Sequence, residues 1–390
     1  MAKIGIIGAG IGGLAAAALF ARNGHRVRVF DAFETPRPLG SGLVIQPVGQ
    51  RVLEDIAALP DALKHGRRIT RMKGHEAGAG RLVLDVRYDR INAQAFGLAI
   101  HRSALFQALL DAATQAGATL VPAHQAHEAT ARVIRFDKGR SESGFDLVVD
   151  ASGANSAISP LDSDTLPYGA IWGNVPWPDD SPLPRDELSQ CYHKASRMIG
   201  ALPIGVLPEG SPPMAAVFWS LPAGRHKDWA ARPLEDWKAE ATALWPDFAP
   251  FLQGITTHNA MTMARYTHGT LFRPHRRGIA MIGDAAHRAS PQLGQGANMA
   301  LLDAMALALA FRKHTGADVL RAYARARRWH VRLYQGMSRA FTPMYQSDST
   351  VLPWFRDRVL MPVSKVPPVP RILTRLVCGD LISPLGRLRR

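Results

Sequence analysis

The pattern of apolar positions at the start of the chain changes from a strand to a helix and back to a strand. Residues 3–7 form an apolar run, residues 14–22 are rich in alanine, and residues 26–30 form a second apolar run. The glycine-rich turn Gly8-Ala9-Gly10-Ile11-Gly12-Gly13 joins the first run to the alanine-rich stretch. Strand, glycine turn, helix and strand in this order predict one βαβ unit of a parallel sheet.

The glycines of this turn have separate physical roles in a dinucleotide site. Gly8 permits a tight turn, Gly10 lets a pyrophosphate approach the backbone, and Gly13 lets the helix pack close to the sheet. The phosphates then face the unpaired N–H groups and the positive end of the new helix. Such sites carry an acid about 20 residues further on, which grips a ribose hydroxyl, and Asp31 stands there. We therefore predict that this unit binds a dinucleotide.

The middle of the chain changes to short strand-like runs. Residues 69–97 alternate imperfectly between apolar and polar positions, and residues 166–269 are dense in proline and tryptophan. The candidate strands are 168–175, 187–193, 196–203 and 214–221, and a helix is expected over 234–244. Strands that follow one another without long helices between them favour an antiparallel sheet. We expect the two stretches to form a second domain.

The chain then returns to an α/β pattern. An apolar strand over 277–284 ends in Gly283-Asp284, and a glycine-containing loop leads into a nearly all-apolar helix over 297–312. Prolines set the expected ends of other helices, because proline lacks the N–H that continues a helix. A helix over 48–59 is expected to stop at Pro60, a long basic helix is expected over 317–337, and the proline-interrupted residues 341–390 are expected to form short helices.

The composition is that of a folded globular protein with an excess of positive charge. Hydrophobic residues make up 47% of the chain, charged residues 20%, and the net charge is +15. A positive balance favours anionic partners. The basic residues are scattered, however, and do not interleave with aromatic residues as in nucleic-acid-binding motifs. We therefore expect no nucleic-acid partner, whereas phosphorylated cofactors and a weak attachment of the basic C-terminal helices to a membrane surface stay open.

Cysteines and long apolar runs bear on the cell compartment. The two cysteines, Cys191 and Cys378, form neither a C-x-x-C pair nor a cluster with histidines, so we expect no metal site and no disulfide framework. This usage is typical of a reducing compartment, and we predict a cytoplasmic protein. No apolar run reaches the length of about 18 residues that a membrane span needs, so no transmembrane segment is expected.

Three separated motifs together resemble one known family. They are the glycine turn with Asp31, a strand-end turn over 150–156, and Gly283-Asp284 with the loop Pro291-x-x-Gly294-Gln295-Gly296-x-Asn298. With these motifs the chain resembles the class A FAD-dependent monooxygenases, the p-hydroxybenzoate hydroxylase-like family of aromatic hydroxylases. The resemblance implies an α/β fold: a Rossmann-type FAD-binding domain, an inserted, mostly antiparallel β-sheet substrate domain (α+β in character), and a C-terminal helical tail.

The resemblance also suggests how the chain is divided. The discontinuous FAD-binding domain is expected to comprise residues 1–68, 98–165 and 270–315. The substrate domain is expected to comprise residues 69–97 and 166–269. Residues 316–390 are expected to form the C-terminal helical region.

Single residues take roles around the flavin by the same resemblance. It implies that Asp284 accepts a hydrogen bond from a ribityl hydroxyl, that Arg102 lies near the pyrophosphate, and that Pro291 lines the substrate side of the flavin. The backbone that faces the pyrimidine edge is expected to come from Gly294, Gln295, Gly296, Ala297 and Asn298. The helix that starts there points its positive end at the negative charge of the reduced flavin. Arg37 and Gly42 are expected to form part of the wall.

One motif departs from the family pattern. The common form is Ala-Asp-Gly-x-x-Ser-x-x-Arg, whereas this chain has Ser152 at the acid and Ser159 at the arginine. The family links that acid to the handling of the nicotinamide donor, so the departure bears on how the flavin is reduced. Asp150 stands two residues early, which displaces a side chain by several ångströms along a strand.

The resemblance implies a monooxygenase reaction. NADPH or NADH reduces FAD, and the reduced flavin captures O₂ as a hydroperoxide that transfers one oxygen atom to a small aromatic or otherwise apolar, electron-rich molecule; the protein supplies orientation and excludes water. Two alternatives stay open. One is a flavin-dependent reductase or dehydrogenase on the same fold, as in prenyl reductases, and the other is a non-catalytic flavin-binding partner protein.

The substrate side is expected to involve the strands of the second domain. Arg197, Trp219 and Pro291 are the expected substrate-lining residues. A general base that ionises a phenol would be drawn from Tyr192, His193 and His287, although the sequence does not choose among them.

Overall fold

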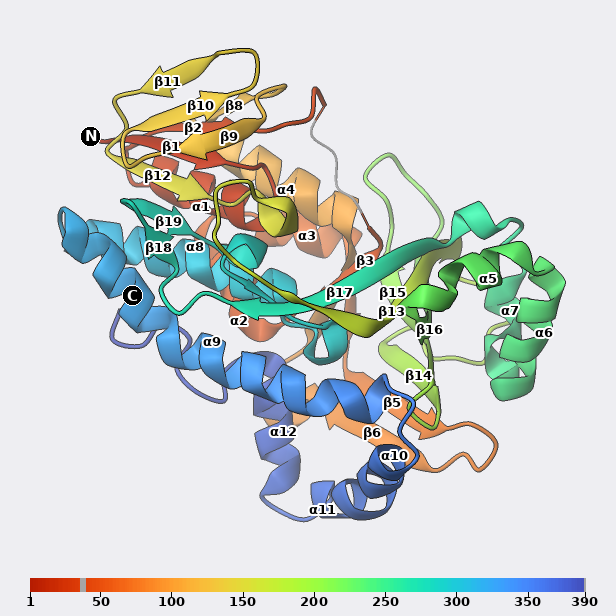
Figure 1. Cartoon of the computed structure of the whole chain (residues 1–390). Coiled ribbons are helices and arrows are strands. Elements are labelled where there is room, and N and C mark those ends of the chain that lie inside the picture. Colours follow the sequence, from red (N-terminus) through yellow and green to blue (C-terminus); the bar gives the residue numbers. More distant parts are fainter. Residues whose placement is uncertain (36–39, 389–390) are drawn as a thin grey trace.

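A six-stranded, mostly parallel sheet forms the centre of the first layer in the computed structural model, which describes residues 1–35 and 40–388. Its strand order is β18-β19-β12-β1-β2-β8 (Figure 1). The strands are β1 (Lys3–Ile7), β2 (Arg26–Phe30), β8 (Thr119–Val121), β12 (Leu147–Asp150), β18 (His275–Arg276) and β19 (Ile279–Met281). Strand β1 pairs in parallel with both β2 and β12, which confirms the predicted βαβ unit. Arg37, expected in the wall of the site, lies outside the described residues.

Helices cover one face of this sheet, and a small β-meander covers the other. The helices are α1 (Ile11–Arg22), α4 (Arg102–Gln115) and α8 (Gly296–Lys313), and the meander consists of β9 (Ala126–Ala129), β10 (Val133–Phe136) and β11 (Ser141–Ser143). Ile4 and Ile6 of β1 are buried together with the alanines of α1, whereas Ile7 packs with Ile134 and Phe136 of the meander. Successive side chains of a strand point to opposite faces of the sheet. Because both faces of this sheet are covered, β1 is apolar at nearly every position.

A larger, mostly antiparallel sheet forms the second layer. Its order is β20-β17-β13-β16-β15-β14-β5-β6, and only the β14–β5 pair is parallel among the described strands. The strands are β5 (Arg71–Glu76), β6 (Leu82–Arg87), β13 (Asp164–Pro176), β14 (Glu187–His193), β15 (Arg197–Gly205), β16 (Met214–Pro222), β17 (Thr262–Thr270) and β20 (His287–Arg288). The prediction of a parallel nucleotide-binding layer with an added antiparallel sheet is therefore confirmed.

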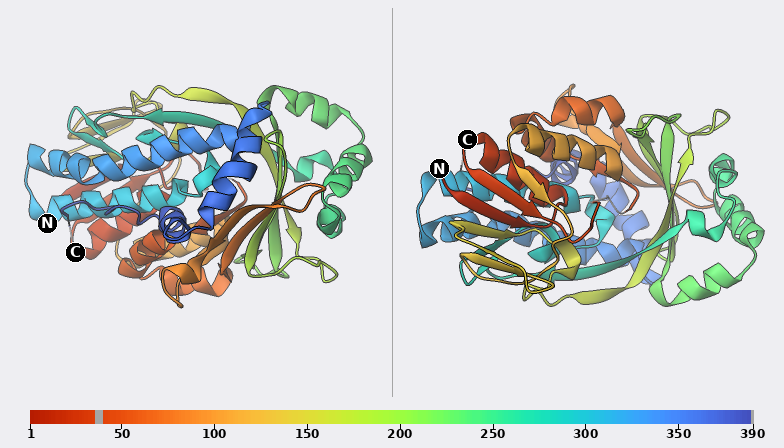
Figure 2. Two further views of the ribbon diagram at one scale, coloured as in Figure 1. Left: turned by 90° about the horizontal axis from the view of Figure 1, so that it is seen from below. Right: turned by 90° about the horizontal axis from the view of Figure 1, so that it is seen from above.

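The two faces of the larger sheet have different neighbours. Helices α5 (His226–Ala231), α6 (Leu234–Leu244) and α7 (Ala249–Leu252) cover the outer face, at the far right of both views in Figure 2. Trp229, Trp237 and Trp245 are buried on that face. The inner face is turned toward a small sheet of order β3-β7-β4, made of β3 (Gly42–Ile45), β4 (Arg67–Ile69) and β7 (Gly97–His101). The inner face is therefore the one that meets the first layer.

Short helices connect these layers, and one of them corrects a prediction. Helix α2 (Pro47–Asp55) ends before Pro60, and Pro60 lies in the first turn of α3 (Leu59–His65) instead of ending a helix. Proline is tolerated in a first turn because the N–H group it lacks would have no partner within the helix. The 3₁₀ turns are η1 (Tyr88–Arg90), η2 (Gly153–Asn155), η3 (Ala223–Arg225), η4 (Pro246–Phe248), η5 (His258–Ala260), η6 (Gly283–Ala285) and η7 (Pro291–Leu293).

The C-terminal region is helical, as expected. Helix α9 (Ala317–Tyr345) continues past its expected end at Met337 and carries Pro343 in its last turn. The chain then forms α10 (Val351–Phe355), a π-helical turn (Arg356–Leu360), α11 (Met361–Ser364) and α12 (Val369–Cys378), which lie below the body in Figure 1. Among residues 1–35 and 40–388, no helix has the length and apolar character that a membrane span requires.

Candidate functional site

The carboxyl end of the parallel sheet collects most of the residues singled out from the sequence. Strands β1, β2, β12 and β19 run in the same direction and are neighbours. The glycine turn follows β1, Asp31 follows β2, Ser152 follows β12, and Asp284 follows β19. Ligands of open α/β sheets bind outside this edge of the sheet. The structure therefore brings these predicted residues to one edge, although they come from distant parts of the chain.

The glycine turn has the geometry that a phosphate needs. Gly8 has a φ of +98°, and a Cβ atom there would lie 2.6 Å from the carbonyl oxygen of Ala151. A Cβ atom at Gly13 would lie 2.0 Å from the carbonyl oxygen of Gly8, so only glycine fits. At Gly10, by contrast, a Cβ atom would meet nothing within 4 Å. The backbone at the start of α1 is therefore open to an anion, and the positive end of the helix faces it.

Asp31 is fastened to this turn. Its Oδ2 atom accepts a hydrogen bond from the N–H of Ala9 at 2.8 Å, and its Oδ1 atom accepts one from the N–H of Phe33 at 3.0 Å. A carboxylate has about four acceptor positions, so these two bonds leave capacity for a ribose hydroxyl. The position of Asp31 is thus compatible with its expected role.

Arg102 and Asp284 lie close enough to influence each other. Arg102 is the first residue of α4, and Asp284 lies in turn η6 directly after β19. Burial by neighbouring atoms lowers the pKa of Arg102, and the carboxylate of Asp284 opposes that shift. In the part of the chain that the structure describes, neither side chain is tied up in an ion pair. A cation for the pyrophosphate and an acceptor for the ribityl hydroxyls are therefore both available.

The loop from Pro291 to Asn298 presents the start of α8. Turn η7 leads to Gly294, and α8 begins at Gly296, where a Cβ atom would meet nothing within 4 Å. The fully buried Asn298 side chain donates to the carbonyl oxygens of Gly294 and Val44 and accepts from the N–H of Gln46. Asn298 therefore fixes the shape of the loop through its side chain, beyond the backbone role expected for it.

Two other expected residues of this region also have packing roles. The Gln295 side chain donates to the carbonyl oxygen of Val377 at 2.6 Å, which ties the loop to α12. A Cβ atom at Gly42 would lie 2.2 Å from Ile204 and 2.9 Å from Ala216, so Gly42 allows β3 to approach the inner face of the large sheet. A cofactor contact at Gly42 stays a prediction.

Gln46 is a residue that sequence reasoning missed. It is fully buried, and its Oε1 atom accepts a hydrogen bond from the hydroxyl of Tyr88 at 2.8 Å. Its Nε2 atom has no hydrogen-bond partner among the described residues, and it lies 3.8 Å from the position of a Cβ atom at Gly294. A buried donor without a partner is costly unless a ligand completes it. The signal available in the sequence is one polar residue between the apolar run 43–45 and Pro47.

The turn after β12 is organised from inside by Asp150. This fully buried carboxylate accepts hydrogen bonds from the N–H and hydroxyl of Ser152 and from the hydroxyl of Ser156, the last at 2.6 Å. The hydroxyl of Ser159 donates to the carbonyl oxygen of Ala285 at 2.6 Å. Ser152 therefore closes this turn on Asp150, and Ser159 binds it to the turn that carries Asp284.

The structure places two of the expected substrate-lining residues on the outer face of the large sheet. Trp219 is buried on the outer face of the large sheet, where its ring centre lies 6.0 Å from that of Trp237. Arg197 lies on the same face, 3.5 Å from the carboxylate of Glu240 and over the ring of Trp219. Their strand neighbours Met198 and Phe218 point to the inner face instead. Trp219 and Arg197 therefore face the outer helices, whereas an adjacent position on each strand faces the first layer.

The inner face is aromatic. Phe218 lies 4.5 Å from Trp172 between ring centres, and the Trp172 indole donates to the hydroxyl of Tyr266. Tyr192 of β14 lies 5.3 Å from Tyr345 of α9. The buried cluster that contains Phe218 and Tyr192 continues the surface met by Gly42. A flat apolar ligand would find matching rings on this face.

The three candidate bases occupy unsuitable positions. Burial, followed by the neighbouring Tyr345, raises the pKa of Tyr192 well above its usual value, so its phenol keeps its proton. His193 is exposed at the end of β14, and His287 is buried and bound to Asp303. None of the three fits the role of a base that removes a substrate proton.

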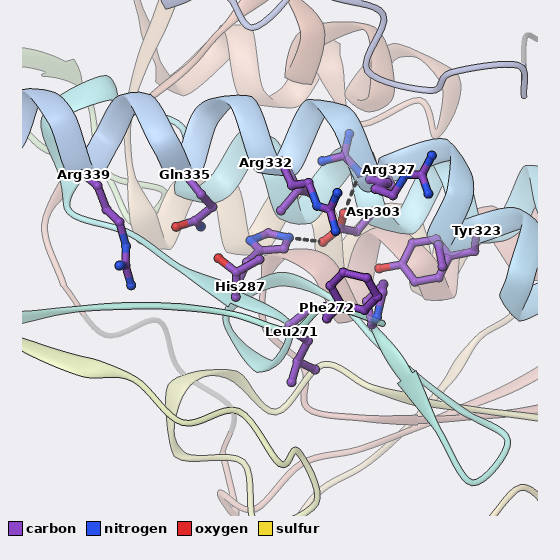
Figure 3. A pocket seen from close by; sticks show the side chains of 15 residues that line it. Leu271, Phe272, His287, Asp303, Tyr323, Arg327, Arg332, Gln335 and Arg339 are labelled. Carbon is purple, nitrogen blue, oxygen red and sulfur yellow. Dashed lines mark hydrogen bonds and ion pairs between the residues drawn. The ribbon is translucent and has the colours of Figure 1, made fainter.

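Asp303 of α8 links the Asp284 turn to α9. Its Oδ2 atom accepts a hydrogen bond from the Gly283 N–H at 3.0 Å. Oδ2 also accepts one from His287 Nε2 at 2.6 Å, and Oδ1 accepts one from Arg327 Nε at 2.7 Å (Figure 3). Burial raises the pKa of Asp303, but His287 and Arg327 outweigh this effect and lower it to about 2. An ionised Asp303 therefore holds the turn in place.

A pocket of about 340 Å³ lies beside this network, between α9 and the residues after β17. Its wall includes Arg328 as well as Phe272, Arg332 and Gln335, and the last three lie around the His287 side chain in Figure 3. The residues expected to hold the flavin are not part of this wall. The pocket is therefore separate from the carboxyl edge of the sheet.

Comparison with known proteins now decides the family. The model of the FAD binding domain family matches residues 1–335. The chain belongs to this family of FAD-binding proteins. Hispidin-3-hydroxylase of Neonothopanus nambi is 28% identical over 357 residues, which are 80% of this chain and 81% of that protein. Kynurenine 3-monooxygenase of Salinispora arenicola is 26% identical over 378 residues, 87% of this chain and 79% of that protein.

Solved structures agree with this fold. A mutant of 2-methyl-3-hydroxypyridine-5-carboxylic acid oxygenase matches with a TM-score of 0.80 and 20% identity, over 99% of this chain and 100% of that one. Klebsiella pneumoniae HpxO, complexed with FAD and uric acid, matches with a TM-score of 0.79 and 20% identity, over 98% of each chain. The resemblance drawn from the motifs is thus confirmed: the protein is an FAD-dependent oxidoreductase of the aromatic monooxygenase type. The reductase and non-catalytic alternatives gain no support.

Proposed function

We propose that the protein hydroxylates a small aromatic molecule at the inner face of the large sheet, with O₂ and NADPH or NADH as co-substrates. The observation that carries the proposal is that one edge combines two open helix starts, at Gly10 and Gly296, with the aromatic inner face around Phe218. The helix starts suit the two ends of FAD, its pyrophosphate and its pyrimidine ring. When bound, FAD supplies the redox chemistry that activates O₂.

The residues present fit FAD in specific ways. The N–H groups at the start of α1 and the guanidinium of Arg102 would hold the pyrophosphate, Asp31 a ribose, and Asp284 the ribityl chain. The unpartnered Nε2 donor of Gln46 would face the flavin end of the cofactor, next to Gly294. The N-terminus of α8 would favour negative charge on the pyrimidine ring. Pro291, exposed in turn η7, would lie at the substrate side.

The aromatic substrate class rests on the inner face and on the relatives. Phe218, Trp172 and Tyr192 form an aromatic cluster on this face that contains no carboxylate. The relatives are named for hydroxylation of hispidin, urate, kynurenine and 6-hydroxynicotinate, all of them rings with oxygen or nitrogen substituents. We infer that this chain acts on a substituted aromatic or heteroaromatic ring. Because the candidate bases are unsuitable, we infer that a phenolic substrate loses its proton to solvent water.

The donor and the compartment belong to the same proposal. Asp150, buried beneath Ser152, places a carboxyl group two residues before the position of the family acid. We infer that this turn still serves direct reduction by a nicotinamide donor, without a separate reductase. Both cysteines, Cys191 and Cys378, are buried free thiols, and burial raises the pKa of each to about 12. Such protonated thiols are compatible with the cytoplasm, which we propose as the compartment.

The proposal is tested by turnover assays on the purified protein. NADH and NADPH oxidation, O₂ consumption and incorporation of isotopically labelled O₂ into product are followed with a panel of phenols, hydroxypyridines and purines. We expect at least one ring compound to accelerate nicotinamide oxidation and to gain one labelled oxygen atom. Flavin reduction that occurs only with an added reductase would contradict direct use of the donor. Accelerated oxidation with peroxide as the only oxygen product, across the whole panel, would contradict the hydroxylase assignment.

A further inference from the structure

Exposed apolar side chains are concentrated on one stretch of the C-terminal helices. Among the residues that the structure describes, eleven large hydrophobic side chains are exposed, and seven of them fall between residues 351 and 372. These seven, called here the C-terminal apolar face, are Val351, Trp354, Phe355, Val359, Val363, Val366 and Ile372. Single exposed apolar residues are normal, whereas a contiguous group on a monomer marks a binding surface.

The C-terminal apolar face follows the period of a helix. Val351, Phe355, Val359 and Val363 recur at every fourth position through α10, the π-helical turn and α11. Residues at this spacing lie on one side of a helix. The opposite side of the same run is buried against the body of the protein through Pro353, Arg356 and Met361. The run therefore carries apolar residues on its solvent side as well as on the side that faces the core.

Arg356 holds this run rigidly. Its guanidinium donates two hydrogen bonds to the carboxylate of Asp357 and one to the carbonyl oxygen of Met344. The same guanidinium lies 5.1 Å from the ring centre of Tyr192 and 5.0 Å from that of Tyr345. A charged group fixed by so many partners holds its helix to the sheet. The apolar face is thus presented by an ordered element that contacts the aromatic cluster of the inner face.

Basic residues surround the C-terminal apolar face. Residues 351–375 contain five basic residues and a single acid, Asp357, which Arg356 already binds. Arg358, Lys365 and Arg371 are exposed among the apolar residues. Apolar side chains with a tryptophan and flanking cations are typical of helices that lie in the headgroup region of an anionic membrane. A second copy of the same face would instead bring like charges together, because this chain carries a net charge of +15.

We propose that the C-terminal apolar face docks the protein on the surface of a bilayer that contains anionic phospholipids. The apolar side chains enter the boundary between headgroups and acyl chains, and the basic side chains bind lipid phosphates. Docking places the membrane on the solvent side of the helical run, whose opposite side contacts Tyr192 and Tyr345 through Arg356. An apolar ring compound dissolved in the membrane would then be concentrated at the surface of the protein. The docking inference itself does not depend on the proposed reaction.

The test is co-sedimentation of the full-length protein with vesicles of phosphatidylcholine, with and without phosphatidylglycerol. The double variant Phe355→Glu/Val363→Glu removes apolar area and adds charge on the face. The matched control Phe272→Glu/Trp329→Glu makes the same charge change at two exposed aromatic residues elsewhere. We expect the wild type and the control to bind anionic vesicles about tenfold more strongly than neutral ones, and the face variant to lose that binding. Added salt should weaken the binding of the wild type.

Other results overturn the proposal. They are equal sedimentation with neutral and anionic vesicles, no sedimentation of the wild type, or a face variant that binds like the control. Light scattering after size-exclusion chromatography tests whether a second copy of the chain binds the face instead. If the wild type is a dimer and only the face variant is a monomer, the face is a dimer interface. If the face variant does not fold, the single variants Phe355→Ser and Val363→Ser, with Phe272→Ser as the control, test the same face, and unchanged vesicle binding by both would overturn the proposal. Flavin content, measured in parallel, separates this inference from the proposed function.

Discussion

The carboxyl edge of the parallel sheet and the inner face of the large sheet are built by different means. At the edge, residues close in sequence make the decisive contacts: a Cβ atom at Gly13 would strike the carbonyl oxygen of Gly8, and Asp31 accepts from the Ala9 N–H. At the inner face, Tyr192, Phe218 and Tyr345 meet from strands and a helix far apart in sequence. A cofactor-binding edge built from local motifs can be predicted from the sequence. A substrate-binding face depends instead on which side of the sheet each side chain occupies.

The largest loss of stability is expected at the buried Asp303 network, which holds the Asp284 turn. Arg327→Met leaves the buried carboxylate of Asp303 with one cationic partner fewer, and breaking a buried pair costs about 3–5 kcal/mol. Arg328→Met, at the next position on α9, is the matched control because Arg328 is exposed and has no carboxylate partner among the described residues. Urea unfolding followed by circular dichroism measures both. Equal stability of the two variants would show that the Asp303 network does not support the edge.

The glycine turn offers the second test. Gly13→Ala forces backbone to move, because its Cβ atom would lie 2.0 Å from the Gly8 carbonyl oxygen, and we expect a loss of about 1–3 kcal/mol in unfolding free energy. Gly10→Ala meets no atom of the protein, so we expect native stability with weakened FAD binding. Thermal unfolding and a flavin titration distinguish the two. If Gly10→Ala retains full FAD affinity, the pyrophosphate does not lie at this turn.

The pH dependence of the unfolding free energy tests the buried polar network of Asp303, Arg327 and His330. Burial, followed by the positive charge of Arg327, lowers the pKa of His330 from 6.5 to about 3, and its Nε2 atom lies 2.8 Å from the carbonyl oxygen of Gly379. A depressed folded-state pKa contributes stability above the unfolded value, and this stability is lost as the pH falls from about 6.5 toward about 3. Between about pH 7 and about pH 5 the loss should reach about 2 kcal/mol. Asp303, with a pKa of about 2, adds its loss only below about pH 4.

The variant His330→Gln isolates this term. Glutamine can still donate to the Gly379 carbonyl but does not titrate. Chemical unfolding at the two pH values should therefore show a smaller acid loss in the variant than in the wild type. Identical acid losses would assign the effect to other groups.

The smallest expected effects compare the two faces of β16. Phe218→Leu removes a ring from the inner face and should raise KM for the aromatic substrate about tenfold, equivalent to about 1.4 kcal/mol, with little change in flavin content. Trp219→Leu removes a ring from the outer face and should lower stability while leaving KM unchanged. Steady-state kinetics and thermal unfolding of both variants measure the split. A KM effect confined to Trp219→Leu would reverse the assignment of the faces.

The sequence was sufficient to predict most helices and strands and the turns at the carboxyl edge of the parallel sheet. The run 187–193 and the helix 234–244 have the predicted bounds, and the Gly283-Asp284 turn lies where the motif indicates. These features depend on local hydrophobic period and on glycines whose role is steric. Local rules failed at Pro60, because proline is compatible with a first turn as well as with an end.

The substrate side was beyond what the sequence could decide. The sequence did not show that Trp219 and Arg197 face the outer side of the large sheet, because both faces of this sheet are buried and an apolar strand pattern does not distinguish them. Gln46 was missed because its importance comes from Tyr88 and Asn298, which are distant in sequence. Such roles depend on how layers pack, and no single-strand pattern contains that information.

The most direct test of the account is a titration of flavin-free protein with FAD, read by the visible spectrum. The account predicts a stoichiometric, yellow complex for the wild type, markedly weaker binding for Asp284→Asn, and a shift of the bound flavin spectrum when an aromatic substrate is added to the wild type but not to Phe218→Leu. A folded wild-type protein that stays colourless after addition of FAD would contradict the central claim.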